Sequence, residues 1–113
     1  AHQTATTLSG GERQSLAISR AVYFESRILL LDEPVAALSV RETRRVFDAI
    51  ETAKSKGLGV LYIDHNMEHV LPVADRIAIM HKGGLLRVVT RGELSAEELA
   101  DAVAHSGLSD DEE

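Results

Sequence analysis

The sequence predicts an α/β fold built on a mostly parallel sheet with flanking helices and a β-hairpin near the C-terminus. Two short, wholly apolar runs, residues 28–31 and 60–63, lie on either side of a helical pattern. Such runs are typical of strands buried on both faces of a parallel sheet, and strand, helix, strand in that order implies a right-handed crossover. With 113 residues, 44% apolar and only 4% aromatic, we expect one domain with an aliphatic core.

Three helices are expected, and each begins with the same polar pattern. Residues 9–23 carry a small apolar stripe, residues 40–56 carry a second one that is closed by Gly57, and residues 95–106 read as an amphipathic helix. All three start with S-x-x-E, the capping box in which a serine and a glutamate satisfy free backbone N–H groups.

The C-terminal part predicts a hairpin followed by an acidic tail. The runs RIAIM and LLRVVT flank HKGG, which places a turn around Gly83 and Gly84. Residues 108–113 are acidic and are expected to be disordered.

Composition excludes several classes of function. The net charge of −6 argues against a nucleic-acid partner, which would require clustered Lys and Arg. The absence of cysteine excludes disulfides and thiolate metal sites. No apolar run approaches the ~20 residues that span a bilayer, and no signal peptide is visible. We expect a cytoplasmic or peripheral protein.

Polar residues with chemical potential follow the two predicted strands. Asp32 and Glu33 end the first, and Asp64 and His65 end the second. The carboxyl ends of parallel strands lie at one edge of the sheet, where ligands of open α/β sheets bind. Adjacent carboxylates can divide the work, with Asp32 facing a hard cation such as Mg²⁺ and Glu33 orienting a water. Taken alone, the pair reads more simply as solvated turn carboxylates.

His65 and the glycine pair also have a simple and a functional interpretation. His65 is either a polar residue near a helix start or a hydrogen-bond donor to a phosphate. Its i, i+4 spacing with His69 does not make a metal site, because the H-E-x-x-H pattern is missing. Gly10 and Gly11 either follow a cap or allow backbone N–H groups to approach an anion at the helix N-terminus.

Several ordered motifs resemble those of the ATP-binding-cassette (ABC) ATPases. LSGGERQ resembles the signature motif of that family, ILLLDEP its Walker B segment with the following glutamate, VAALS its D-loop and YIDHNMEHV its switch-histidine loop. ADRIAIMHKGGLL resembles the strand pair that comes next, so the resemblance runs from about Leu8 to Gly92. It implies a partial P-loop NTPase-type fold, with residues 1–107 as the C-terminal part of an ABC ATPase domain.

The resemblance also implies a site shared by two subunits in a head-to-tail dimer. Ser9, Gly10 and Gly11 of one subunit would contact the γ-phosphate of ATP held by the other, with Gln14 near the nucleotide. In the strand-end site, Glu33 would polarise the attacking water, Asp32 would support Mg²⁺, and His65 would contact the γ-phosphate. Phosphoryl transfer mainly requires such positioning and charge stabilisation. Membrane-spanning permease subunits would be further partners, placing the protein on the inner face of the membrane.

The sequence departs from the family pattern in ways that shape the expectation. It contains no G-x-x-x-x-G-K-[ST], so we expect the phosphate-gripping half to lie upstream and this chain alone neither to bind ATP tightly nor to hydrolyse it. Ser39 stands where many relatives have an aspartate, and Asp64 where a Ser or Thr often precedes the histidine. The AALxVxET and HNMxHV patterns are similar to ATPases that serve monosaccharide importers.

The sequence favours two functions over a DNA-repair or chromosome ATPase, against which the acidic charge and the wording of the signature argue. One is the energy-coupling ATPase of an importer, represented by its C-terminal part. The other is a non-catalytic module that docks on an intact ATPase through its signature face. Glu33 and His65 favour the first, because a docking module would not need them. Without its neighbouring strands, the domain is expected to be marginally stable or self-associating.

Overall fold

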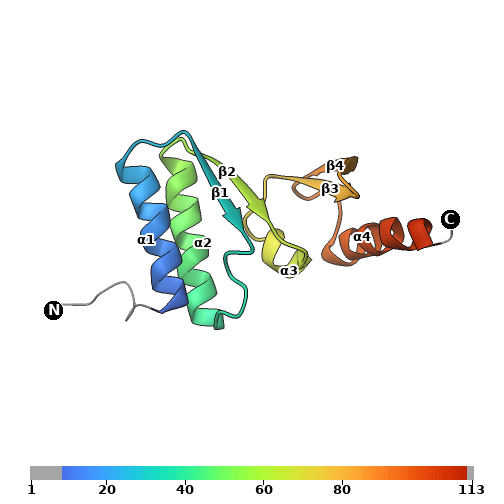
Figure 1. Ribbon diagram of the computed structural model, residues 1–113, viewed down its shortest axis with the longest axis horizontal. Helices are drawn as coiled ribbons and strands as arrows, with labels where there is room; N and C mark the ends of the chain where they lie inside the picture. Colours follow the sequence, from blue (N-terminus) through green and yellow to red (C-terminus); the bar gives the residue numbers. More distant parts are fainter. Residues whose placement is uncertain (1–8, 112–113) are drawn as a thin grey trace. The chain divides into compact units, whose positions relative to one another are not determined.

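The computed structural model describes residues 9–111, which form two compact units divided between His65 and Asn66 (Figure 1). The length of the chain predicted a single domain. The division arises because each part has a core of its own: Ile18, Val46 and Ile50 are central to the first, and Ile79, Val89 and Leu99 form the second. Among the described residues, no helix is long and apolar enough to cross a membrane.

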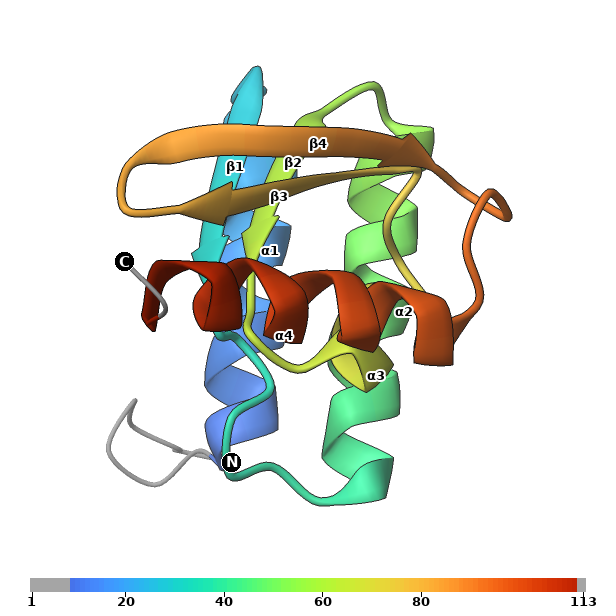
Figure 2. The same cartoon turned by 90° about the vertical axis from the view of Figure 1, so that its right-hand side faces the viewer.

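The first unit alternates helices and strands: α1 (Gly10–Tyr23), β1 (Ile28–Asp32), α2 (Val40–Ser55) and β2 (Gly59–Ile63). The strands pair in parallel, in a register that runs from Ile28 opposite Gly59 to Asp32 opposite Ile63. The predicted crossover is therefore confirmed. Figures 1 and 2 show α1 and α2 packed lengthwise beside the strand pair.

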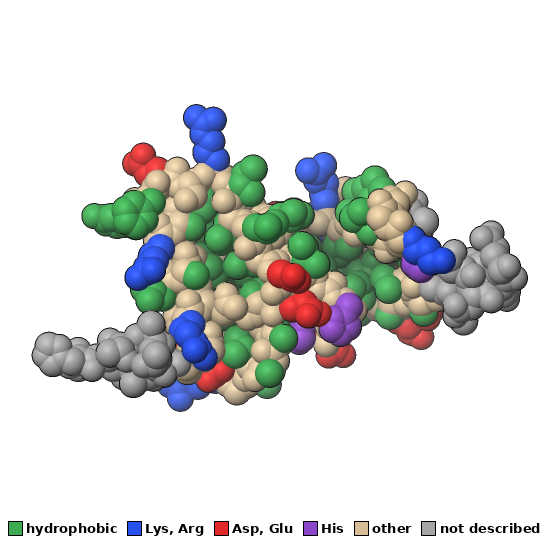
Figure 3. All heavy atoms as spheres, in the orientation of Figure 1, with side chains coloured by type: hydrophobic (Ala, Val, Ile, Leu, Met, Phe, Trp, Pro, Cys, Tyr) green, Lys and Arg blue, Asp and Glu red, His purple; other side chains and the backbone are tan. Residues whose placement is uncertain are grey.

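One expectation about this sheet is wrong. Strand β1 was predicted to be buried on both faces, yet its residues alternate, with Leu29 and Leu31 packed in the core and Ile28 and Leu30 71% and 63% exposed. The helices cover one face only, and in the described part of the chain β1 hydrogen-bonds to β2 alone. Apolar side chains consequently reach the surface over this unit (Figure 3).

The second unit contains α3 (Met67–Val70), β3 (Arg76–His81), β4 (Gly84–Thr90) and α4 (Ala96–Asp111). The strands form the predicted antiparallel hairpin, in which Lys82 and Gly83 turn the chain with φ values of 47° and 77°. Positive φ at both central residues is characteristic of the two-residue turn that matches strand twist. Helix α4 continues to Asp111, so residues 108–111 of the expected disordered tail are helical, since a single glycine at 107 is tolerated within a helix. The last two residues of that tail lie outside the described residues.

The serine half of each of the three predicted capping boxes is present. The hydroxyl oxygens of Ser9, Ser39 and Ser95 each accept a hydrogen bond, at 3.1 Å, from the backbone N–H of the glutamate three residues later. At Ser95 the box is reciprocal, because its own N–H donates to the Glu98 carboxylate at 3.2 Å. The S-x-x-E pattern therefore sets where α1, α2 and α4 begin.

Candidate functional site

The candidate site lies where β1 and β2 end side by side in the first unit. The backbone N–H of Glu33 donates to the carbonyl oxygen of Ile63 at 2.7 Å, which ties the residue after β1 to the end of β2. Glu33 has a φ of 45°, in the left-handed region that non-glycine residues seldom occupy. This turn takes the Glu33 side chain out of the alternation of the strand.

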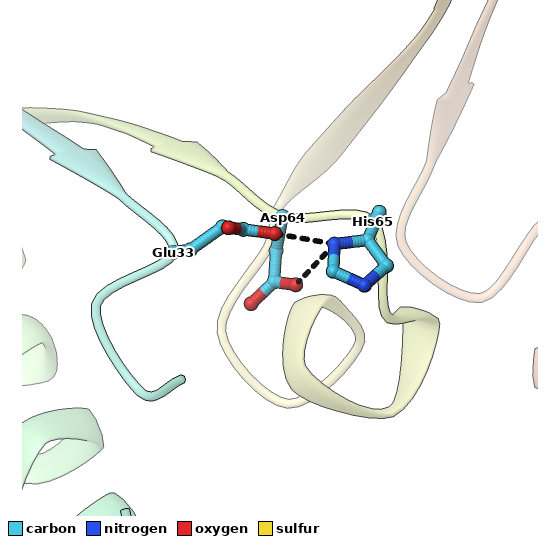
Figure 4. A group of neighbouring side chains, drawn as sticks. All are labelled: Glu33, Asp64 and His65. Atoms are coloured by element: carbon cyan, nitrogen blue, oxygen red, sulfur yellow. Dashed lines mark hydrogen bonds and ion pairs between the residues drawn. The ribbon is translucent and has the colours of Figure 1, made fainter. Parts of the chain in front are cut away.

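Glu33 and His65 meet at this edge, as the parallel order of the strands predicted. Figure 4 shows Nδ1 of His65 facing Oε1 of Glu33, and a hydrogen bond joins the two atoms. Because an ionised carboxylate only accepts hydrogen bonds, the imidazole is the donor. The imidazole is 86% exposed and the Glu33 side chain 41%, so both are accessible to a ligand.

Asp64 lies beneath this pair and is almost fully buried. Its side chain is 3% exposed, with Oδ1 3.9 Å from Nδ1 of His65. The Tyr62 hydroxyl donates to Oδ2 of Asp64 at 3.3 Å. Partial burial, and secondarily the charge of Asp64, raises the pKa of Tyr62 above its ordinary value of about 10. Sequence reasoning placed Asp64 at this edge but gave it no role, although Asp64 directly follows β2 and lies two residues after Tyr62, the spacing at which residues of an extended chain point the same way.

Asp32, the expected magnesium ligand, lies apart from this group. It is exposed and follows Leu30 on the uncovered face of the sheet. A single exposed carboxylate fits Mg²⁺, which commonly takes one or two carboxylates together with phosphate oxygens. Among the described residues, a different set, Glu33, Asp64 and His65, offers three ligand atoms within 4.8 Å of one another. The imidazole in that set suits transition metals better than Mg²⁺.

The signature residues lie at the start of α1. Ser9 is engaged as its N-cap, Gly10 begins the helix, Gly11 is buried and Gln14 is partly buried. A Cβ atom on Gly11 would come within 2.8 Å of Cβ of Glu42, and one on Gly10 within 2.8 Å of Leu38. Gly11 therefore has a packing role that sequence reasoning missed, because it allows α2 to approach α1, whereas the Leu38 atom near Gly10 is the end of a flexible side chain that can move aside.

Relatives match nearly all of the chain. A xylose/arabinose import ATP-binding protein of Sulfolobus acidocaldarius is 44% identical over 101 residues, which is 89% of this chain and 40% of that protein. A fructose import ATP-binding protein of Rhizobium meliloti is 45% identical over 103 residues, 91% of this chain and 38% of that protein. A family model described as ABC transporter matches residues 1–36.

Over nearly all of its length the chain is therefore similar to ATP-binding proteins of ABC transporters. Solved ATP-binding cassettes of ABC transporters share its fold: one in the ADP conformation has a TM-score of 0.73 at 24% identity, covering 96% of this chain and 41% of that one. A nucleotide-free cassette has a TM-score of 0.74 at 24% identity, covering 90% and 39%. The predicted P-loop NTPase-type fold is thus confirmed. The chain spans about 40% of the length of the xylose/arabinose relative.

Proposed function

We propose that this chain is the C-terminal part of the ATP-hydrolysing subunit of an importer, and that the imported substrate is a sugar. The observation that carries the proposal is the contact between Glu33 and His65 at the ends of parallel strands. Both side chains are accessible, and they belong to motifs that occur in the expected order. The relatives named as sugar import proteins support the substrate class.

In this proposal each residue has one task. The Glu33 carboxylate would orient the attacking water, and His65 would contact the γ-phosphate. Asp32 would hold Mg²⁺, which neutralises developing charge on the phosphates when it is bound. Ser9, Gly10, Gly11 and Gln14 would face ATP bound by a second subunit.

The uncovered face of the sheet supports completion by a further polypeptide. Ile28, Leu30, Leu61 and Ile63 line that face and are between 47% and 71% exposed. Burying one such side chain fully contributes roughly 1.5–3 kcal/mol, so a covering segment would be held firmly. We propose that this segment carries the phosphate-gripping loop, which the 113 residues do not contain.

Assembly follows from the same proposal. The completed ATPase would pair head to tail with a second copy and act with membrane-spanning permease subunits. Its place would be the cytoplasmic, inner face of the membrane. No nucleic-acid partner is proposed, since the net charge is −6.

The test is Mg-ATP binding and turnover by the 113-residue chain alone and after co-expression with the N-terminal half of the Sulfolobus relative. We expect neither activity from the chain alone and turnover from the pair. Glu33→Gln in the pair should reduce turnover by roughly 100-fold or more, because it removes the group that orients water. Glu33-dependent hydrolysis by the chain alone would refute the need for completion. A pair that binds without Glu33-dependent turnover would instead indicate a docking module.

A further inference from the structure

We propose that Asp64 is a positioning residue that holds the imidazole of His65 with Nδ1 toward Glu33 and Nε2 toward the ligand. The inference rests on the proposed function, since it concerns the ring that would hold the phosphate. It assigns a role to a residue for which the sequence motifs indicate none. The proposal is based on three groups that lie together at the end of β2: the buried carboxylate of Asp64, the hydroxyl of Tyr62 and the exposed imidazole of His65.

The first step is that Asp64 is fixed while His65 is not. The Asp64 side chain is 3% exposed and the His65 ring is 86% exposed, so packing holds the first and leaves the second free. An exposed side chain needs polar contacts to keep one orientation, because rotamer freedom opposes it. Glu33 provides one such contact, but its side chain is itself 41% exposed. Asp64 is the rigid member of the three.

The second step is that Tyr62 fixes Asp64. The Tyr62 hydroxyl donates to Oδ2 of Asp64 at 3.3 Å, and its ring lies 6.5 Å from that of Phe47. The raised pKa of Tyr62 means that the hydroxyl keeps its proton, and therefore this hydrogen bond, throughout the neutral range. With Oδ2 engaged by Tyr62, Oδ1 is the oxygen that lies 3.9 Å from His65.

The third step concerns the proton on the imidazole ring. Carboxylate oxygens of Glu33 and Asp64 both face Nδ1, and Figure 4 shows Nε2 pointing away from both. A neutral imidazole carries its proton on either nitrogen, and the partner of one nitrogen decides the state of the other. Two anionic oxygens at Nδ1 keep the proton there. In that neutral ring Nε2 is an acceptor, which can take a hydrogen bond from a water, and it can donate to a phosphate oxygen only when both ring nitrogens carry a proton.

The test reads the ring directly, by long-range ¹H–¹⁵N correlation spectra of the imidazoles in the 113-residue chain. A His65→Gln spectrum assigns the His65 signals. We expect the neutral ring to carry its proton on Nδ1 in the unmodified chain and to lose that preference in Asp64→Asn, which keeps the shape and removes the charge. Tyr62→Phe should give an intermediate loss. Asp48→Asn, the same change on the exposed surface of α2, should leave the spectrum unchanged.

A second readout uses the completed ATPase. Asp64→Asn should lower kcat on the order of tenfold with little change in KM, because a misplaced group is costly only in the transition state. Absent turnover in the unmodified pair would refute the proposed function, while the ring spectra would still decide the role of Asp64. An Asp64→Asn ring that keeps its proton on Nδ1 would overturn the inference, whatever the turnover.

Discussion

Asp32 and Glu33 are neighbours in the sequence, yet their backbones adopt different conformations. Asp32 still follows the alternation of β1 and therefore emerges on the uncovered face with Leu30. Glu33 leaves the strand with a φ of 45°, which costs of order 1–3 kcal/mol for a non-glycine residue. The hydrogen bond from its N–H to Ile63 helps to hold that conformation. The different roles expected of the two carboxylates are thus consistent with the change in backbone conformation between Asp32 and Glu33.

Tyr62 leads to a prediction for alkaline pH. Partial burial first, and then the charge of Asp64, raises its pKa above the ordinary value of about 10. The folded state therefore holds the proton more tightly than the unfolded state does. This contribution to the free energy of unfolding is complete below about pH 10 and is lost as the pH rises beyond it. Urea titrations between pH 8 and 11 should show a steeper loss of stability in the unmodified chain than in Tyr62→Phe.

The control for this experiment is the other tyrosine of the chain. Tyr23 is 80% exposed at the end of α1, so Tyr23→Phe removes an equivalent hydroxyl without touching the β2 network. It should keep the alkaline loss of stability of the unmodified chain. If stability falls equally with pH in the unmodified chain and in Tyr62→Phe, the folded state does not raise the pKa of Tyr62.

At the scale of the elements, α1 and α2 approach each other closely at their N-termini. A Cβ on Gly11 would lie 2.8 Å from Cβ and 3.3 Å from Cα of Glu42, and a backbone atom cannot simply move aside. Gly11→Ala should destabilise the chain by about 1–3 kcal/mol through overpacking, after a gain of up to about 1 kcal/mol from helix propensity. Chemical unfolding measures this directly.

Gly59→Ala is the matched control for that substitution. A Cβ there would meet the carbonyl oxygen of Arg27 at an ordinary 3.6 Å, so the unfolding midpoint should hardly change. If Gly11→Ala proves as stable as Gly59→Ala, the glycine is not needed for packing and its purpose would be contact with a ligand alone.

Helix starts and strand order could be predicted from the sequence, whereas burial could not. The S-x-x-E pattern is local, so the caps at Ser9, Ser39 and Ser95 follow from residues within one turn. The exposure of Ile28 and Leu30 depends on which segments cover the sheet. An apolar run in the sequence does not indicate which segments those are. The hydrogen bond from Tyr62 to Asp64 was missed because its role depends on how deeply the Asp64 side chain is buried, which the sequence does not indicate.

At the scale of the whole molecule, the site was predictable where it depends on chain order. Glu33 and His65 come together because both follow parallel strands, which the strand, helix, strand order already implied. The expected contacts of Ser9, Gly10, Gly11 and Gln14 involve a second subunit, so they stay predictions. A single chain can show only that these residues gather at the start of α1.

The uncovered face of the sheet gives the last prediction. Leu30 and Leu61 are 63% and 55% exposed on adjacent strands, and such contiguous apolar surface drives association in water. The isolated chain should self-associate with increasing concentration in sedimentation velocity, and the double substitution Leu30→Thr with Leu61→Thr should shift it toward the monomer. Val40→Thr, at an 81% exposed position on α2, should have no such effect. A chain that stays monomeric at all concentrations, without either substitution, would show that this face needs no cover, and the argument for a completing polypeptide would then rest on the missing phosphate-binding motif alone.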